Sequence, residues 1–410
     1  MQNDQEKETT EANGLSQPID PSTLYRIVEV DDIDCWKRFV LGQMVESENK
    51  LVVGDCEFGG SKWIYRGQSD AAWPIDSSFQ LNISPSFQRV WSLERSLRGR
   101  ERESILEFKK LAWRYVQNPE MDDLEWLTLM RHHGVPTRLV DFSESALIAL
   151  YFALERKLKE PDGKSEPDFA VWAINRDAMT NCYVQSMIGK QFLYMKNLIA
   201  KYGQQYGNNL TQVINNPEFI CDPDVRSAKE LCTTIQPSAT SSLIVSEANR
   251  AAALKILTSP LETSFDDHAM SPVIYIYPGM PSPRMLAQKG LFLMATRISE
   301  PFMNSLFKGL EIDREALKVE KIRVSEIMDA KYKIYNAKMI KFEFHRDQED
   351  ELRNRLRFSN CVKGTMYPDI EGAAEMVKEN VIASLSNHRT VDSELSPEQQ
   401  QHILMCGKPE

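Results

Sequence analysis

The sequence has no apolar stretch long enough to cross a lipid bilayer. Its longest wholly apolar run, Ala146–Leu154, has nine residues, whereas a membrane-spanning helix needs about 20. Residues 1–20 are polar and acidic, and they lack the apolar centre of a secretion signal. We therefore expect no membrane association and a cytoplasmic location.

Paired cysteines are also missing. The seven cysteines are scattered, odd in number and never arranged as Cys-x-x-Cys. This distribution argues against a disulfide framework and against a structural zinc site. Of the six histidines, only His132 and His133 are close together in the sequence. We therefore expect no metal site.

Two common catalytic signatures are absent. A phosphate-binding loop would need a glycine five residues before Gly163-Lys164-Ser165, but Leu158 stands there. No Gly-x-Ser-x-Gly sequence occurs, so the nucleophile turn of α/β-hydrolases is missing. Kinase, GTPase and hydrolase functions of these types have no support in the sequence.

An excess of positive charge is lacking as well. The net charge of −10 argues against a protein that binds nucleic acid with its whole surface. Locally, however, Arg89–Arg114 contains eight basic and four acidic residues, with Trp91 and Trp113 near its ends. This segment either contacts RNA or DNA phosphates or forms a solvated helix face with pairs such as Glu94–Arg98.

What the sequence does contain is the pattern of a mixed protein. It has 410 residues, 42% of them hydrophobic, which is enough for a sizeable core. Apolar alternation and helical periodicity predict an α+β fold, with strands near residues 25–30, 63–66, 137–141, 169–174, 272–277, 319–324, 339–345 and at the end of 283–296. We expect a disordered tail at 1–20, a domain at 21–386 with a helical insertion at about 177–265, and a flexible tail at 387–410.

Polar residues gather in two segments, Leu127–Ala153 and Trp63–Asp70. In the first, a helix is expected to end at Gly134, an extended run follows, and an apolar helix begins at Ser145. In the second, Arg66 follows an apolar strand beside Gly67, and a glycine permits close approach. Polar groups at strand ends predict a functional site.

Each candidate in these segments also has a structural interpretation. Arg66 either binds a phosphate with its guanidinium fork or forms a buried ion pair, for example with Asp141. His132 and His133 either contact a substrate or cap a helix. Arg138 and Asp141 are expected to form structural salt bridges by default. Ser143 and Ser145 either cap the next helix or contact a substrate.

Four blocks of the sequence resemble the FRG domain family, which is named for a Phe-Arg-Gly motif. They are YRGQSD…W at Tyr65–Trp73, HHGVPTRLVDFSESALIALYFA at His132–Ala153, PRMLAQKGLF at Pro283–Phe292 and MYPDIEG at Met366–Gly372. Tyr65 replaces the phenylalanine of the motif. The resemblance covers roughly residues 25–378. It implies membership of a domain family but does not identify a reaction.

A more distant similarity links the chain to ADP-ribosyltransferases. Arg66 matches their first-strand arginine, and the Ser143–Ser145 turn followed by ALYFA matches their Ser/Thr element. Where that family has a glutamate on a late strand, this chain has Gln288. Glutamate stabilises the positive charge that develops on the ribose, so Glu144 or Asp141 would have to supply that charge.

This second resemblance implies an ADP-ribosyltransferase-like split sheet and a function. The chain would be an NAD-dependent mono-ADP-ribosyltransferase, acting as a bacterial toxin or phage-defence effector on a nucleic acid, RNA included, or on a protein. The catalytic residues would be Arg66, Gln288 and Ser143. NAD would be bound by Tyr65, Arg66, Gly67, His132, His133 and Ser145.

An antitoxin or regulatory protein is the expected partner, since the polar tails can fold on binding. The alternative is a non-catalytic sensor that binds a nucleotide or a partner in the same cleft.

Overall fold

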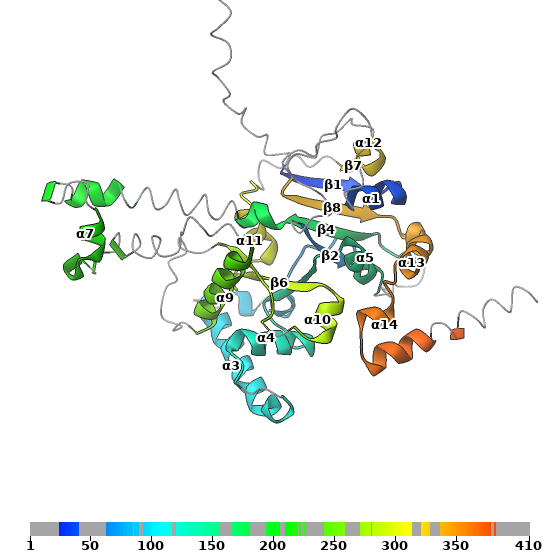
Figure 1. Cartoon of the computed structure of the whole chain (residues 1–410), viewed down its shortest axis with the longest axis horizontal. Helices are drawn as coiled ribbons and strands as arrows, with labels where there is room; N and C mark the ends of the chain where they lie inside the picture. Colours follow the sequence, from blue (N-terminus) through cyan, green and yellow to red (C-terminus); the bar gives the residue numbers. More distant parts are fainter. Residues whose placement is uncertain are drawn as a thin grey trace, which may run out of the picture.

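The computed structural model describes residues 24–40, 63–116, 120–155, 166–180, most of 194–226, 242–258, 271–313, 321–328, 337–378 and 381–382, apart from a few single positions in these ranges. Helices and strands alternate around one sheet, which confirms the predicted α+β class (Figure 1). No helix within these ranges is long and apolar enough to cross a membrane. The tails predicted at 1–20 and 387–410 lie outside the described residues.

The described strands form a single mixed sheet in the order β5-β6-β3-β2-β4-β8-β1-β7. β1 runs parallel to both β7 and β8, and the other neighbours are antiparallel. The bounds are β1 Tyr25–Glu29, β2 Trp63–Gln68, β3 Leu139–Ser143, β4 Phe169–Asn175, β5 Val273–Ile276, β6 Gly290–Ala295, β7 Lys321–Arg323 and β8 Met339–Phe344.

The sheet is nearly divided between β2 and β3. These two strands are joined by one bridge pair, Tyr65 with Ser143, whereas β2 pairs with β4 along its whole length and β3 does the same with β6. The expected split sheet is therefore continuous, but its two parts share a narrow connection. Main-chain groups of β3 next to this connection are left free of the ladder with β2, and the Asp141 oxygen accepts from the Arg66 side chain instead.

Two groups of helices cover the two parts. Helices α1, α5 and α13 pack on β2, β4, β8 and β1 in one core. Helices α3, α4 and α9 pack on β3, β6 and β5 in another. A third core includes α11. It is formed by the strand residues that alternate with those of the first two cores and therefore point to the opposite face of the sheet.

The bounds of the helices are α1 Ile33–Val40, α2 Ser78–Leu81, α3 Leu93–Ala112, α4 Asp123–His132, α5 Ala146–Glu155, α7 Leu210–Asn215, α9 Ser242–Thr258, α10 Pro283–Ala287, α11 Phe302–Gly309, α12 Val324–Met328, α13 Glu349–Phe358 and α14 Lys363–Met366. Short 3₁₀ turns occupy Phe87–Arg89, Trp113–Tyr115, Pro217–Phe219 and Arg346–Gln348.

The predicted insertion at 177–265 is only partly separate. A small cluster around Leu198, Val213 and Val225 forms its own core, and Figure 1 shows α7 away from the sheet. Helix α9, by contrast, buries Ala253 and Ile256 against the sheet and α4. The end of the insertion thus belongs to the main body, because its apolar face completes the core over β5.

Gly67 lets helix α5 lie directly on β2. A Cβ atom at this position would stand 1.9 Å from the carbonyl oxygen of Ala149 and 2.6 Å from the nitrogen of Ala153. Neither backbone group can move without displacing the helix. The close approach predicted at this glycine is therefore made by α5.

Candidate functional site

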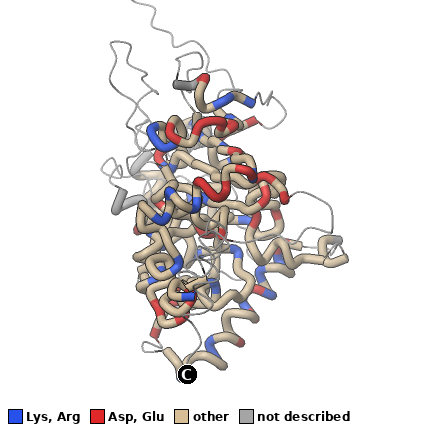
Figure 2. Tube along the Cα trace, turned by 90° about the vertical axis from the view of Figure 1, so that its right-hand side faces the viewer, with Lys and Arg blue, Asp and Glu red and all other residues tan. Residues whose placement is uncertain are grey.

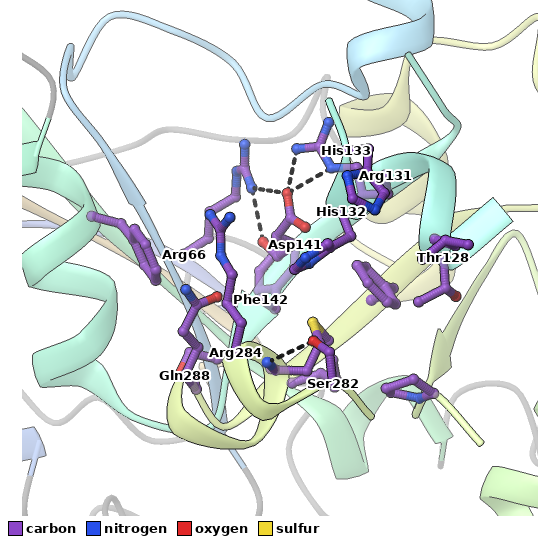
Figure 3. Close-up of a pocket in the computed structure, with 18 of the residues that line it drawn as sticks. Arg66, Thr128, Arg131, His132, His133, Asp141, Phe142, Ser282, Arg284 and Gln288 are labelled. Atoms are coloured by element: carbon purple, nitrogen blue, oxygen red, sulfur yellow. Dashed lines mark hydrogen bonds and ion pairs between the residues drawn. The ribbon is translucent and has the colours of Figure 1, made fainter. Parts of the chain in front are cut away.

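A pocket of about 690 Å³ opens beside the narrow connection between β2 and β3. Its walls come from β2, β3 and β6 and from helices α4, α5 and α10. Figure 3 shows three guanidinium groups, those of Arg66, Arg131 and Arg284, around the same cavity as Asp141 and His132. The two predicted polar segments therefore meet in space.

Local sequence signals fix the end of α4 at this pocket. The helix begins with a capping box, in which Asp122 accepts from the Glu125 amide and Glu125 accepts from the Asp122 amide. It ends at His132, and Gly134 takes the positive φ of 79° that stops the helix. The last turn thus presents Arg131 and His132 to the cavity.

Arg66 and Arg131 share one carboxylate, that of Asp141. Arg131 donates to it from Nε at 2.9 Å and also from Nη2. Arg66 donates from Nη1 to the main-chain oxygen of Asp141 at 2.8 Å, and its Nη1 lies 4.0 Å from the carboxylate. Among the described residues, the buried Nε of Arg66 has no hydrogen-bond partner. Two cations and one anion leave this corner with a net positive charge.

The charges of this trio are stable near neutral pH. Burial raises the pKa of Asp141. The charge and hydrogen bonds of Arg131, with a smaller contribution from Arg66, lower it by more, so the pKa lies below the usual range. Burial lowers the pKa of Arg66, and Asp141 partly opposes that effect. Arginine stays protonated in proteins. The corner therefore favours an added anion.

Arg284 supplies a third guanidinium from α10. It lies over the ring of Tyr367, with 4.2 Å from Cζ to the ring centre, and within the described part of the chain no carboxylate forms an ion pair with it. Tyr367 is held by a 2.8 Å hydrogen bond to Glu155. A cation that is stacked on a ring but has no counter-ion is suited to a phosphate.

Gln288 lies in the turn between α10 and β6, as the C-cap of α10, whereas it was expected on the strand itself. Lys289 separates it from β6 with a positive φ of 45°, so the strand begins only at Gly290. The Gln288 side chain lines the pocket, and its Nε2 donates to the main-chain oxygen of Met366 at 3.0 Å. It therefore also joins α10 to α14.

Ser143 and Ser145 have structural partners. Ser143 Oγ donates to the Gln288 main-chain oxygen at 2.8 Å and accepts from the Ser145 amide at 3.1 Å. Ser145 Oγ, 3.5 Å from the Ile148 amide, lies at the start of α5. Ser143 lines the pocket together with Tyr65, Gly67 and His133. Ser145 is not among the lining residues.

Of the two acidic substitutes for a late-strand glutamate, only Asp141 lines the pocket. Glu144 accepts from Tyr277 and lies 3.3 Å from Arg176 Nη1. This pairing holds Glu144 against β4 and β5 instead.

Arg138 and the buried side of α3 have structural partners. Arg138 donates to the two carboxylate oxygens of Glu101 at 2.8 and 2.9 Å, and the side chains are 2% and 4% exposed. Glu94 accepts from the Ser299 amide at 2.8 Å, and its charge also acts on Arg98, where it opposes the lowering of the pKa by burial. Arg98 is buried and donates to the Ile256 oxygen at 3.2 Å.

Sequence reasoning missed Arg131 and Arg284 as members of the site. Both stand inside blocks that had been singled out, next to His132 and four residues before Gln288. Arg131 resembles an ordinary basic residue in the last turn of a helix, and Arg284 is one of several arginines on short helices. Only the packing of α4 and α10 against β3 and β6 in one core brings them together.

The family model of the FRG domain matches residues 61–162. This range runs from β2 through α5 and includes Arg66, Arg131, His132 and Asp141. The predicted FRG resemblance is thereby confirmed for this segment, while Arg284, Gln288 and Tyr367 come from outside it. No curated protein and no solved structure matches the chain. The similarity to ADP-ribosyltransferases stays a prediction.

Proposed function

We propose that this chain, which contains an FRG domain at residues 61–162, is a cytoplasmic NAD-dependent mono-ADP-ribosyltransferase. The observation that carries the proposal is a pocket lined by three guanidiniums, of which Arg66 and Arg131 share the single carboxylate of Asp141. Such a pocket favours a ligand with two or more negative charges. The diphosphate of NAD has this character, and we assign it to Arg66 and Arg284.

The size and the lining agree with a nucleotide. A volume of about 690 Å³ lies in the range of ligand pockets, roughly 300–1,000 Å³. Beside the charged groups, the wall contains apolar side chains that can pack against a base or a nicotinamide ring: Leu129, Phe142, Phe152, Pro278, Met285 and Phe292.

Transfer needs a group that stabilises positive charge on the ribose. Asp141 lines the pocket and is ionised at neutral pH, since its pKa lies below the usual range. We assign this electrostatic role to Asp141 and a hydroxyl-orienting role to Gln288, whose Oε1 remains an acceptor.

A non-catalytic nucleotide sensor is the second candidate. It is favoured by the pairing of the pocket carboxylates with cations: Asp141 with Arg131, Glu125 with Arg250 and Glu155 with Lys363. A carboxylate that is neutralised in this way stabilises a developing cation less strongly.

Two measurements on one preparation separate the candidates. Calorimetric titration with NAD tests binding, and release of nicotinamide tests turnover. We expect Arg284→Ala to weaken NAD binding about tenfold or more, because a charge-assisted hydrogen bond contributes about 1.5–3 kcal/mol. Arg284 is preferred to Arg66 for this test, because Arg66 also bonds to the main chain of β3.

The matched control is Arg323→Ala, which removes the same charge from β7 at the far edge of the sheet. Equal NAD affinity in Arg284→Ala and Arg323→Ala would contradict the assigned binding site. Saturable binding without release of nicotinamide would favour the sensor over the transferase.

We further propose that the activity serves as a toxin or phage-defence effector, restrained by an antitoxin or regulatory protein. The test is expression of the wild type and of Arg284→Ala in bacterial cells. Growth inhibition by the wild type alone supports this role. Equal growth of both strains at equal protein levels would contradict it.

A further inference from the structure

His132 is one of two imidazoles, with that of His133, among the residues that line the pocket. It is the last residue of α4 and extends into the cavity (Figure 3). Its ring lies 5.0 Å from that of His133, edge to face. Among the described residues, its imidazole has no hydrogen-bond partner. Both ring nitrogens are thus available to a bound molecule.

The surroundings of His132 keep its imidazole neutral. Partial burial lowers its pKa, and the charges of Arg284 and His133 lower it further, while Asp369 opposes them. The end of a helix favours the protonated form, yet the net pKa lies below its usual value of 6.5. The other charged residues that line the cavity are Arg66, Arg131, Asp141, Glu125 and Glu155. At neutral pH His132 can therefore accept a proton.

The three carboxylates of the pocket already have hydrogen-bond partners. Asp141 accepts from Arg131 at 2.9 Å, Glu125 accepts from the Asp122 amide at 3.1 Å, and Glu155 accepts from Lys363 at 2.8 Å. Each of these carboxylates already accepts a hydrogen bond, and the pKa of Asp141 lies below its usual range. His132 has neither a partner to give up nor a charge to lose.

We propose that His132 is the general base of the transfer, a role that rests on the proposed function. One imidazole nitrogen takes the proton of the acceptor hydroxyl, or of water, as that oxygen bonds to the ribose carbon of NAD. The bond from that carbon to nicotinamide breaks, and its electron pair leaves with neutral nicotinamide. The imidazolium then returns the proton to solvent, so one proton is released per turnover.

The test is nicotinamide release by the wild type, His132→Ala and the control His345→Gln. His345 is bonded to Glu29 at 2.9 Å and to Asp168 at 3.2 Å and is not among the residues that line the pocket. We expect His132→Ala to lower kcat about 100-fold or more and to change the Kd of NAD less than threefold. Added imidazole should restore part of the lost rate, which a merely structural role would not allow. The wild-type rate should fall on the acid side, below pH 6.5, because the base must be unprotonated.

The outcomes separate the two proposals. A wild-type rate in His132→Ala overturns the role of His132 and leaves the transferase intact. A loss of rate without rescue by imidazole, or with an equal loss of NAD affinity, also overturns it. Wild-type protein that binds NAD but releases no nicotinamide at any pH overturns the transferase, and the general base with it.

Discussion

The Arg66 guanidinium donates a hydrogen bond to the main-chain oxygen of Asp141, 2.8 Å away, at the place where β2 and β3 cease to pair. Between these strands the only bridge pair in the described sheet is Tyr65 with Ser143. A side chain thus takes over where the main-chain ladder stops. The same arginine lines the pocket, so the pocket lies where the pairing of β2 with β3 stops.

The packing of α5 on β2 depends on Gly67. We expect Gly67→Ala to lower the free energy of unfolding by about 1–3 kcal/mol or more, because the added methyl group meets main-chain atoms of α5. Urea denaturation checks this result. Gly309→Ala is the control, since its Cβ would lie 3.7 Å from the nearest atom. Equal stability of the two variants would contradict the close packing.

The Asp141 carboxylate should make stability depend on pH. Its pKa in the folded protein lies below the usual value, so its contribution is present above about pH 4 and is lost as the pH falls further. We expect Asp141→Asn to cost about 1 kcal/mol at pH 7, a small value because the side chain is 47% exposed and the ion pair is screened.

This cost should shrink toward pH 3 when unfolding is measured in urea at both pH values. The control is Asp350→Asn, on the exposed side of α13. A difference between wild type and Asp141→Asn that stays constant with pH would show that the ion pair does not act in this way.

Gln288 is committed to α14 through its amide nitrogen. Replacing it with Glu restores the residue type of ADP-ribosyltransferases but removes the donor to the Met366 oxygen. We expect Gln288→Glu to lower the free energy of unfolding by about 1–3 kcal/mol, the cost of placing an acceptor against an acceptor, and to leave nicotinamide release no faster. The control is Gln88→Glu, an exposed position on the 3₁₀ turn Phe87–Arg89. A faster release by Gln288→Glu would mean that the α14 contact is dispensable.

The outer face of α3 is the predicted track for a nucleic-acid acceptor. Figure 2 shows basic and acidic residues interspersed along the chain, and Arg102 and Lys110 are exposed on α3. We expect the double variant Arg102→Ala, Lys110→Ala to reduce labelling of RNA or DNA and its dependence on salt, while NAD hydrolysis stays unchanged. Arg98 is left intact, because it is buried.

Treatment of the labelled lysate with nuclease or protease identifies the acceptor. A label removed by protease and resistant to nuclease would contradict a nucleic-acid acceptor. Arg323→Ala on β7 again provides the control for loss of charge.

Much of the fold follows from the local sequence pattern. Alternating apolar residues predicted the strands that contain Tyr65, Leu139, Val171 and Phe292, and all four belong to one sheet. The end of α4 at Gly134 was predicted as well, because a glycine with positive φ followed by proline stops a helix. These signals are local, so a few neighbouring residues are enough to determine them.

The location of the site was predicted correctly, but not all of the predicted residues belong to it. Arg66, His132, Asp141 and Gln288 all line the pocket. Arg66 and Asp141 lie inside β2 and β3, whereas His132 ends α4 and Gln288 caps α10. Ser145 instead lies at the start of α5. A serine that begins a helix and a serine that binds a substrate have the same sequence signature. Only the folded structure shows whether the side chain lines the pocket.

The sequence by itself indicated the main strands, the end of α4 and the segments that carry polar side chains. Tertiary structure decided that β2 and β3 meet at one pair, that Arg131 and Arg284 join Arg66 around one pocket, and that Arg138 is buried against Glu101. Helices and strands depend on residues that are close in the sequence, and the spacing of apolar residues indicates them. The charge of the pocket depends on side chains more than 150 residues apart along the chain, from Arg66 to Arg284, and only the packing of the sheet and its helices brings them together.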